Sequence, residues 1–283
     1  MLKKKLDELT LKDNFMFCAV MADVDNCRGF LEMCLGISVG RVEVSSEKSV
    51  VFRPEYRSVQ LDVYAKDADN THYDIEMQVV QKPGLARRSR YYHSQMDMEL
   101  LHCGQDYPEL SDCFVIFVCD FDPFGKGRYL YTFENCCLEE GELKQEEGCR
   151  SVFLNTCVRN LEEVPAGLVN FLEFVKADLA ESQRNFRDVY VTQLQDSIRL
   201  IKSSREMEDK FMTLQEVILD ERAEAKVEGR AEVILELLED LGALPDEELA
   251  EKVMNEKRPE VLRRWLKLAA RATSVGQFME EIQ

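Results

Sequence analysis

The sequence predicts an α/β fold, in which a mixed β-sheet flanked by helices is followed by an all-helical C-terminal region. Apolar and polar residues alternate over residues 42–80, and this period of two is typical of half-buried strands. Helical spacing lies on both sides of this region, at residues 11–35 and 87–103. Beyond about residue 160 the strand patterns end, and helical patterns continue to the C-terminus.

The N-terminal stretch is predicted to be helical. Apolar residues share one helical face from Leu11 onward, and Gly36 is suited to end the segment. Thr10 is the expected N-cap residue, because Asp13 follows three residues later in a variant of the capping box.

Several short segments are predicted to be the strands of the sheet. The strands of a hairpin read "SVQLDVYA" and "YDIEMQVV", with "KDADNTH" between them as the turn. The segment "DCFVIFVC" is apolar on both faces, as expected in a sheet that helices cover on both sides. "GRYLYTFENC" and "RSVFLNT" predict two more strands around an acidic loop, and "FDPFG" is expected to form a turn. Residues 42–160 should therefore contribute one mixed sheet.

The C-terminal part is predicted to be entirely helical. The run at residues 184–242 is too long to be one helix of a compact core without a break. Amphipathic stretches after Pro245 predict a short helical bundle. We therefore expect a core domain at residues 1–160, a helical region with a long amphipathic helix at 161–242, and a small bundle at 243–283.

The long helix carries an apolar stripe that needs cover. It could pack against the protein's own core or against a second copy of the chain. We expect a homodimer through this helical region, because an apolar stripe of this length would otherwise be exposed. The stripe comprises Phe211, Leu214, Ile218, Val233, Ile234, Leu237 and Leu241.

The charge and hydropathy of the chain exclude some classes of protein. With 54 acidic and 36 basic residues the net charge is -18, which excludes a protein that coats nucleic acid through bulk electrostatics. The longest apolar runs, such as residues 114–119, are far shorter than the ~18 residues that a membrane helix needs. The N-terminus also lacks the apolar core of a signal peptide. We therefore expect a cytoplasmic protein with no membrane contact.

Ten cysteines lie in the first 157 residues, and none of them forms a C-x-x-C pair. This pattern predicts buried free thiols in a reducing compartment. His72, His93 and His102 do not stand at ligand spacing from a cysteine cluster, so a structural zinc site is not expected.

The polar faces of the hairpin strands carry residues that could bind a metal ion. If the turn centres near Asp69, antiparallel pairing places Asp62 opposite Glu76 and Gln60 opposite Gln78, with Cβ atoms ~5 Å apart. Like charges in that position are destabilising and favour a cation between them, and carboxylate oxygens suit Mg²⁺ or Mn²⁺. The alternative is a hairpin whose polar face meets water, where acidic residues need no function.

Motifs spread over residues 8–160 occur in a recognisable order. They read "LKDNFMF", "QLDVYA", "YDIEMQVV", "RRSRYYHSQ", "GQDYPELSDCFVIFV", "FDPFGKGRYLYTF" and "VFLNT". This order resembles the recombination-promoting nuclease and transposase family, within the PD-(D/E)XK nuclease superfamily. The resemblance is looser through the helical tail. It implies a restriction-endonuclease-like fold and a metal-dependent DNA endonuclease that acts in recombination or in defence against mobile elements.

The resemblance also implies roles for the hairpin residues. Asp62 corresponds to the metal-binding Asp, Glu76 to the second carboxylate, and the carbonyl of Met77 to a further ligand of Mg²⁺ or Mn²⁺. Gln78 stands where most of the superfamily has Lys, and it would align a water, because an amide cannot act as a general base at neutral pH. Asp13 is a candidate for the acidic residue of the first helix, but it could equally cap a helical turn.

One basic stretch could contact DNA. Residues 82–95 carry four basic residues and no acid, directly after the second hairpin strand. Arg88, Tyr92 and Gln95 stand at i, i+4 and i+7 of a predicted helix and could line the same cleft as the carboxylates. The alternative is a solvated arginine run and a tyrosine packed at the edge of the core. The predicted DNA-binding residues are Lys82, Arg87, Arg88, Arg90, Tyr92 and Gln95.

The sequence therefore supports two classes of function. The presence of Asp62, Glu76 and Gln78 together favours a Mg²⁺-dependent DNA endonuclease. The net charge of -18 favours a catalytically degenerate nuclease fold that acts as an oligomerisation or DNA-binding module.

Overall fold

The computed structural model describes residues 4–50, 59–159, 164–241 and 245–282, without the side chains of residues 46–50, 59 and 60. The chain divides into two compact units, Met1–Met207 and Glu208–Gln283. The helices between residue 160 and this boundary belong to the first unit, so the predicted core boundary at 160 and the unit boundary do not coincide. The division into three regions stays a prediction.

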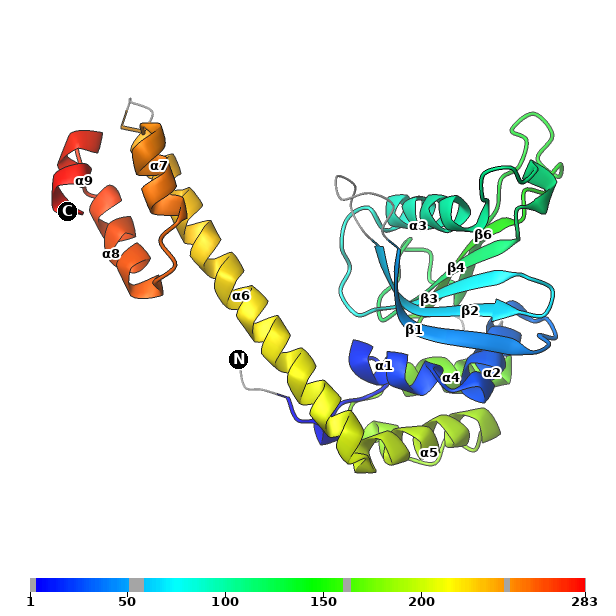
Figure 1. Cartoon of the computed structure of the whole chain (residues 1–283). Coiled ribbons are helices and arrows are strands. Elements are labelled where there is room, and N and C mark those ends of the chain that lie inside the picture. The colour runs from blue at the N-terminus through cyan, green and yellow to red at the C-terminus, as the bar shows by residue number, and fades with distance from the viewer. Residues whose placement is uncertain (1–3, 51–58, 160–163, 242–244, 283) are drawn as a thin grey trace. The chain divides into compact units, whose positions relative to one another are not determined.

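Among the described residues of the first unit, six strands form a mixed sheet (Figure 1). The sheet order is β1-β2-β3-β4-β6-β5. The pairs β3–β4 and β4–β6 are parallel, and the other neighbours are antiparallel, which confirms the predicted mixed sheet. The strands are β1 Val42–Val50, β2 Val59–Asp67, β3 His72–Gln78, β4 Cys113–Cys119, β5 Leu130–Phe133 and β6 Cys149–Asn155.

Helices cover both faces of this sheet. Figure 1 shows α3 on one face and α1, α2 and α4 on the other, and α5 packs against these three helices. Every residue of β4 is consequently buried, as its doubly apolar sequence predicts. The helices are α1 Asn14–Met21, α2 Val24–Leu35, α3 Leu85–Leu100, α4 Ala166–Lys176 and α5 Val189–Ser203.

The N-terminal helices begin and end at identifiable residues. The N-cap of α1 is Asp13, so the prediction of Thr10 as the N-cap is wrong. Thr10 instead forms a turn with Asp13, because its backbone N–H donates to the Asp13 carboxylate at 2.8 Å. Asp23 caps α2 by accepting from two backbone N–H groups. Gly36 ends α2 with a positive φ of 67°, as predicted.

The hairpin has the predicted register. β2 and β3 pair Val63 with Ile75 and Lys66 with His72, and continuing this register places Asp62 opposite Glu76. On the polar face of β3, which α3 covers, Asp74 and Glu76 are buried and Gln78 is half-buried, so the alternative of a face that simply meets water is wrong. The predicted pairing of Gln60 with Gln78 concerns a side chain outside the described part.

The other predicted turn is held by one carboxylate. In the segment "FDPFG" the carboxylate of Asp122 accepts hydrogen bonds from the backbone N–H groups of Phe124, Gly125 and Gly127. It also accepts from the Tyr131 hydroxyl at 2.7 Å. These bonds hold the pKa of Asp122 below its ordinary value, although the partial burial of the carboxylate opposes them.

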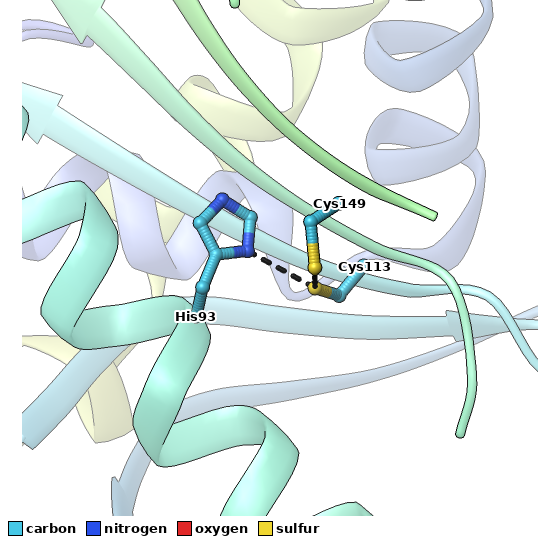
Figure 2. A group of neighbouring side chains, drawn as sticks. All are labelled: His93, Cys113 and Cys149. Carbon is cyan, nitrogen blue, oxygen red and sulfur yellow. Dashed lines mark hydrogen bonds between the residues drawn. The ribbon is translucent and has the colours of Figure 1, made fainter. Parts of the chain in front are cut away.

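The ten cysteines are free thiols in the structure, as predicted, but the prediction that they are buried holds for only five of them. Cys103, Cys136 and Cys157 are exposed, and Cys137 and Cys149 are half-buried. Cys113 and Cys149 lie opposite each other at the start of β4 and β6, and His93 of α3 lies against them (Figure 2). The spacing of the histidines along the sequence did not indicate this contact, and the expectation that there is no structural zinc site stays untested. Spacing along the chain does not reveal a cluster that a sheet assembles from three distant segments.

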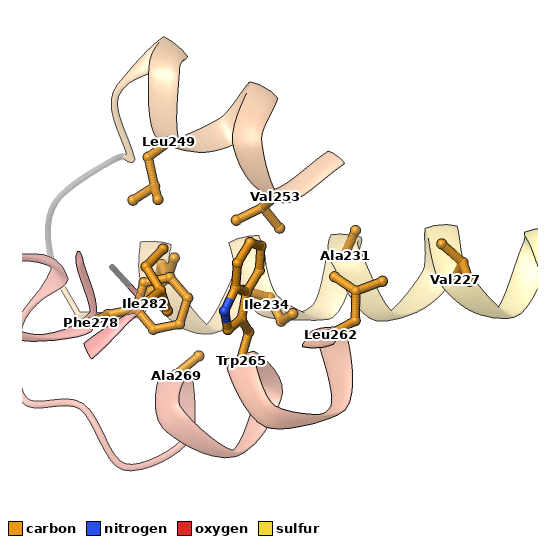
Figure 3. Close-up of a cluster of buried hydrophobic side chains, with 11 residues drawn as sticks. Val227, Ala231, Ile234, Leu249, Val253, Leu262, Trp265, Ala269, Phe278 and Ile282 are labelled. Atoms are coloured by element: carbon orange, nitrogen blue, oxygen red, sulfur yellow. The ribbon is translucent and has the colours of Figure 1, made fainter. Parts of the chain in front are cut away.

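The second unit is a helical bundle around the C-terminal part of α6. The break predicted in the long helical run occurs at Ser204, between α5 and α6. Helices follow Pro245, as predicted, and they pack with the C-terminal part of α6 around Trp265 (Figure 3). A separate bundle at residues 243–283 stays a prediction. The helices are α6 Arg205–Glu239, α7 Glu247–Met254, α8 Pro259–Ala269 and α9 Val275–Glu281.

The predicted apolar stripe of α6 is covered in part by this bundle. Ile234 is fully buried in the bundle core, and Leu237 and Leu241 pack against the same cluster. Ile218 and Val233 are exposed. Dimerisation through this region stays a prediction. None of the helices in the described ranges is long and apolar enough to cross a membrane.

Candidate active site

Side chains from three elements meet at the carboxyl end of β3. β3 contributes Glu76 and Gln78, β2 contributes Asp62, and α3 contributes Arg88 and Tyr92. They meet because α3 packs on the face of the sheet that carries Glu76. The structure therefore brings together three predicted catalytic residues and two predicted DNA-binding residues.

The two predicted metal-binding carboxylates bond to each other's strands. The backbone N–H of Asp62 donates to Oε1 of Glu76 at 3.1 Å, and the N–H of Met77 donates to Oδ2 of Asp62 at 3.1 Å. The paired residues of the β2–β3 ladder end at Val63 and Ile75, one position before this point. Beyond this point the two carboxylates, instead of backbone carbonyls, accept the hydrogen bonds of the neighbouring strand. These bonds hold the two carboxylates close to each other.

The carboxyl groups on this face of β3 are deeply buried. Glu76 and Asp74 are both 0% exposed. Burial, followed by the charge of Asp62, raises the pKa of Glu76 to about 8, although Arg88 acts in the opposite direction. Burial, followed by the charge of Glu76, raises the pKa of Asp74 well above its ordinary value. Glu76 therefore tends to keep a proton near neutral pH, and burial disfavours the charged form of Asp74 as well.

Arg88 contributes positive charge to this group of acids. Its guanidinium forms an ion pair with the Glu76 carboxylate and donates from Nη1 to Oε1 of Gln78 at 3.0 Å. Its Nε donates to the Tyr92 hydroxyl at 2.7 Å, and the guanidinium lies 4.9 Å from the centroid of the Tyr92 ring. The predicted phosphate-binding arginine therefore contacts a carboxylate that was predicted to bind a metal.

Gln78 has a defined orientation. Its Nε2 donates to the carbonyl oxygen of Met77 at 2.9 Å, while its Oε1 accepts from Arg88. The Met77 carbonyl, the third predicted metal ligand, therefore accepts a hydrogen bond from the neighbouring side chain.

The first helix reaches the site through Asn14. Its Nδ2 donates to Oδ1 of Asp62 at 3.2 Å. The carboxylate of the preceding residue, Asp13, accepts instead from the Thr10 N–H and from Nζ of Lys4, at 2.8 and 2.6 Å. In the structure Asp13 therefore caps a helical turn, which is the second of the two roles that the sequence analysis allows for it.

Two residues at the site, Asn14 and Asp74, were not predicted from the sequence. Asn14 follows directly after the predicted candidate Asp13, and nothing in the sequence distinguishes it. Asp74 shares the alternating polar face of Glu76 and Gln78, which could have identified it. Neither carboxylate oxygen of Asp74 has a hydrogen-bond partner among the described residues.

The residues of the basic stretch differ in their exposure: some are exposed to solvent, and others pack against the sheet. Lys82 and Arg87 line an open groove of about 580 Å³ beyond the carboxyl ends of β3 and β4. Arg90 is exposed. Tyr92 is buried against Phe117, with ring centroids 6.3 Å apart, as in the alternative of a tyrosine at the edge of the core.

Gln95 lies further along α3 and is half-buried. In the described part of the chain, its side chain is not among the groups that bond to Arg88 or to Glu76.

The donor set at the site fits a hard divalent cation such as Mg²⁺ or Mn²⁺. Asp62 and Glu76 offer carboxylate oxygens, and Met77 offers a carbonyl, which are the ligand types that such ions prefer. Asp74 adds a buried carboxyl whose oxygens have no partner in the described ranges. Burial and mutual repulsion disfavour the ionised forms of these acids, and a bound cation would compensate the charge that they carry once ionised.

The chain matches a known protein family. A family model described as PD-(D/E)XK nuclease family transposase matches residues 28–234, which is well over half of the chain. This range includes the whole sheet and all of the site except Asn14. Comparisons with curated proteins and with solved structures found no significant match.

Proposed function

Because the chain belongs to the PD-(D/E)XK nuclease family transposases, we propose that it is a metal-dependent endonuclease that hydrolyses phosphodiester bonds in DNA. Asp62, Glu76 and the Met77 carbonyl would hold Mg²⁺ or Mn²⁺. The observation that carries the proposal is the reciprocal bonding of Asp62 and Glu76 to each other's strands. It places two carboxylates together at the end of a buried strand.

The chemistry divides between the cation and the side chains. A bound divalent cation would polarise the phosphate and lower the pKa of a bound water. Glu76 must lose its proton to become a ligand, and its pKa of about 8 means that binding releases a proton near neutral pH. Gln78 cannot take up a proton at neutral pH, so it orients the attacking water through hydrogen bonds.

Arg88 supplies the positive charge that the resemblance assigns to a Lys at the position of Gln78. It reaches the same place from α3, through its bonds to Glu76 and Gln78. With a cation held by Glu76, the pairing of Glu76 with Arg88 would weaken, and the guanidinium would be free to donate to a phosphate oxygen. Guanidinium groups bind phosphate in a bidentate manner, which favours this exchange.

The substrate would approach through the basic groove. Lys82 and Arg87 line this groove, and Arg90 is exposed on the same helix as Arg87. A chain with a net charge of -18 repels DNA elsewhere, so these residues would supply most of the phosphate contacts.

A second candidate is an inactive nuclease fold that binds DNA or assembles with other chains. The ion pair between Arg88 and Glu76 favours it, because this pair already compensates the charge that a metal would compensate. The net charge of -18 and the substitution of Gln78 for the usual Lys favour it as well.

One experiment separates the two candidates. The purified full-length protein is incubated with supercoiled plasmid DNA in Mg²⁺, Mn²⁺ or EDTA, and nicking and DNA binding are measured in parallel. We expect metal-dependent nicking that Asp62→Ala and Asp62→Asn each reduce by more than about 100-fold. Asp62→Asn should bind DNA equally or more tightly, because it removes a negative charge from the site.

Asp69→Asn is the matched control, because Asp69 is an exposed acid in the turn of the same hairpin. It should nick like the wild type. If the wild type binds DNA but nicks with neither metal, or if Asp62→Asn nicks at the wild-type rate, the second candidate becomes the better one.

A further inference from the structure

A histidine and two cysteines meet on the face of the sheet that also carries the candidate active site. They lie at the amino ends of the parallel strands, whereas the candidate active site lies at the carboxyl end of β3. Cys113 and Cys149 are the first residues of β4 and β6, and their Sγ atoms are 3.2 Å apart. Figure 2 shows His93 of α3 pointing toward them, with its Nδ1 3.0 Å from Sγ of Cys113. The three ligand atoms all lie within 4.8 Å of one another.

This set of donors suits a soft or borderline metal ion. Zn²⁺ binds thiolates at ~2.3 Å and imidazole at ~2.0 Å, and ligand atoms around such an ion lie at spacings of this order. A coordinated metal ion deprotonates a thiol, so both cysteines could bind as thiolates. Cys113 is fully buried at the same place.

Second partners hold the histidine in this orientation. Its other ring nitrogen, Nε2, lies 3.1 Å from the hydroxyl of Ser151 on β6. The Ser151 hydroxyl in turn lies 2.6 Å from that of Ser89, which is buried on α3. Metal-binding histidines characteristically use the second nitrogen in this way, which fixes the ring and the tautomer.

Asp97 offers a further donor near the cluster. It lies one helical turn after His93 on α3, and its Oδ1 is buried without a hydrogen-bond partner among the described residues. Burial, followed by the charge of Cys149, raises the pKa of its carboxyl group. Asp97 interacts electrostatically with Cys149 and His93, but its oxygens are not among the ligand atoms that lie within 4.8 Å of one another.

We propose that His93, Cys113 and Cys149 form a binding site for Zn²⁺. The ion would join α3 to the first residues of two central strands. It would thereby fix α3, the helix that also carries Arg88 five residues before His93. The zinc site uses nitrogen and sulfur donors, so it is distinct from the oxygen-rich candidate active site and does not depend on the proposed nuclease activity.

The test measures metal binding to the purified, fully reduced full-length protein. Bound zinc is determined by elemental analysis after dialysis, and Co²⁺ is titrated as a spectroscopic probe of tetrahedral thiolate coordination. We expect one ion per chain and a thiolate-to-cobalt charge-transfer band. Cys113→Ser and Cys149→Ser should each weaken Zn²⁺ binding by more than about 100-fold, and Ser151→Ala by about 10-fold or more.

Cys119→Ser is the matched control, because Cys119 is a fully buried cysteine at the far end of the same strand as Cys113. It should keep its zinc, as should Asp62→Asn. Zn²⁺ at 100 times its Kd should lower the unfolding equilibrium constant of the wild type about 100-fold.

Three results would overturn the proposal. The first is reduced wild-type protein that binds neither Zn²⁺ nor Co²⁺, and this result does not depend on whether any variant folds. The second is an equal loss of zinc in Cys119→Ser and Cys113→Ser. The third is a Cys113–Cys149 disulfide, seen by mass spectrometry of the protein purified under reducing conditions, because a disulfide removes both thiolate ligands.

Discussion

Replacing Glu76 by Gln should remove a pH-dependent loss of stability from the metal-free protein. The folded-state pKa of Glu76 is about 8, against an ordinary value of 4.5. Between these values the folded protein keeps a proton that the unfolded chain releases. The stabilisation by this proton is therefore complete below pH 4.5 and is lost as the pH rises through 8. The amide of the Glu76→Gln variant does not titrate in this range, so the variant should lack this pH dependence.

The size of the effect follows from the pKa difference. One pKa unit corresponds to about 1.4 kcal/mol, so the free energy of unfolding of the wild type should fall by about 3 kcal/mol between pH 5 and pH 8. The Glu76→Gln variant also leaves Arg88 without its anion, but that cost is independent of pH in this range, because arginine stays charged. The change with pH, and not the absolute stability, is therefore the quantity to compare. Asp74 titrates together with Glu76, so the measured change belongs to the pair.

The assay is urea unfolding of both proteins in EDTA from pH 5 to pH 8, followed by hydrogen exchange of the peptides that contain β3. Trp265 is the chain's single tryptophan and lies in the unit Glu208–Gln283, so its fluorescence gives an internal control that should not differ between the proteins. Adding Mg²⁺ at pH 8 should stabilise the wild type more than the variant. A stability difference that stays constant from pH 5 to pH 8 would refute the raised pKa of Glu76.

Three further predictions concern other parts of the chain. Lys82→Glu combined with Arg87→Glu should weaken DNA binding and reduce the slope of log K against log salt by about 2, measured by anisotropy; an unchanged slope would exclude the groove as the contact surface. Trp265→Ala should destabilise the C-terminal unit by about 3 to 5 kcal/mol in calorimetry, because it empties the centre of the bundle core; a loss below about 1 kcal/mol would contradict that packing. Sedimentation should show a concentration-dependent dimer that Ile218→Glu weakens, whereas a monomer at high micromolar concentration would remove the dimer prediction.

The sequence by itself determined the order and type of the elements and the register of the hairpin. Alternation with a period of two, a turn rich in Asp and Asn, and Gly36 at a helix end are encoded within a few residues, and local backbone geometry responds to them directly. The opposition of Asp62 and Glu76 follows from that register alone. The break in the long helical run could be expected for the same reason, although its position at Ser204 could not.

Only the tertiary structure decided which groups surround those carboxylates. Burial of Asp74 and Glu76 depends on α3 covering a face that the alternation alone leaves open to water. The pairing of Arg88 with Glu76, and the meeting of His93 with two cysteines, depend on where that helix crosses the sheet. The strand order places β4 between β3 and β6, and no local pattern encodes that order. The interaction of charges and the coordination of a metal depend on distances in space. Between distant segments of the chain, the packing of the helix on the sheet sets those distances.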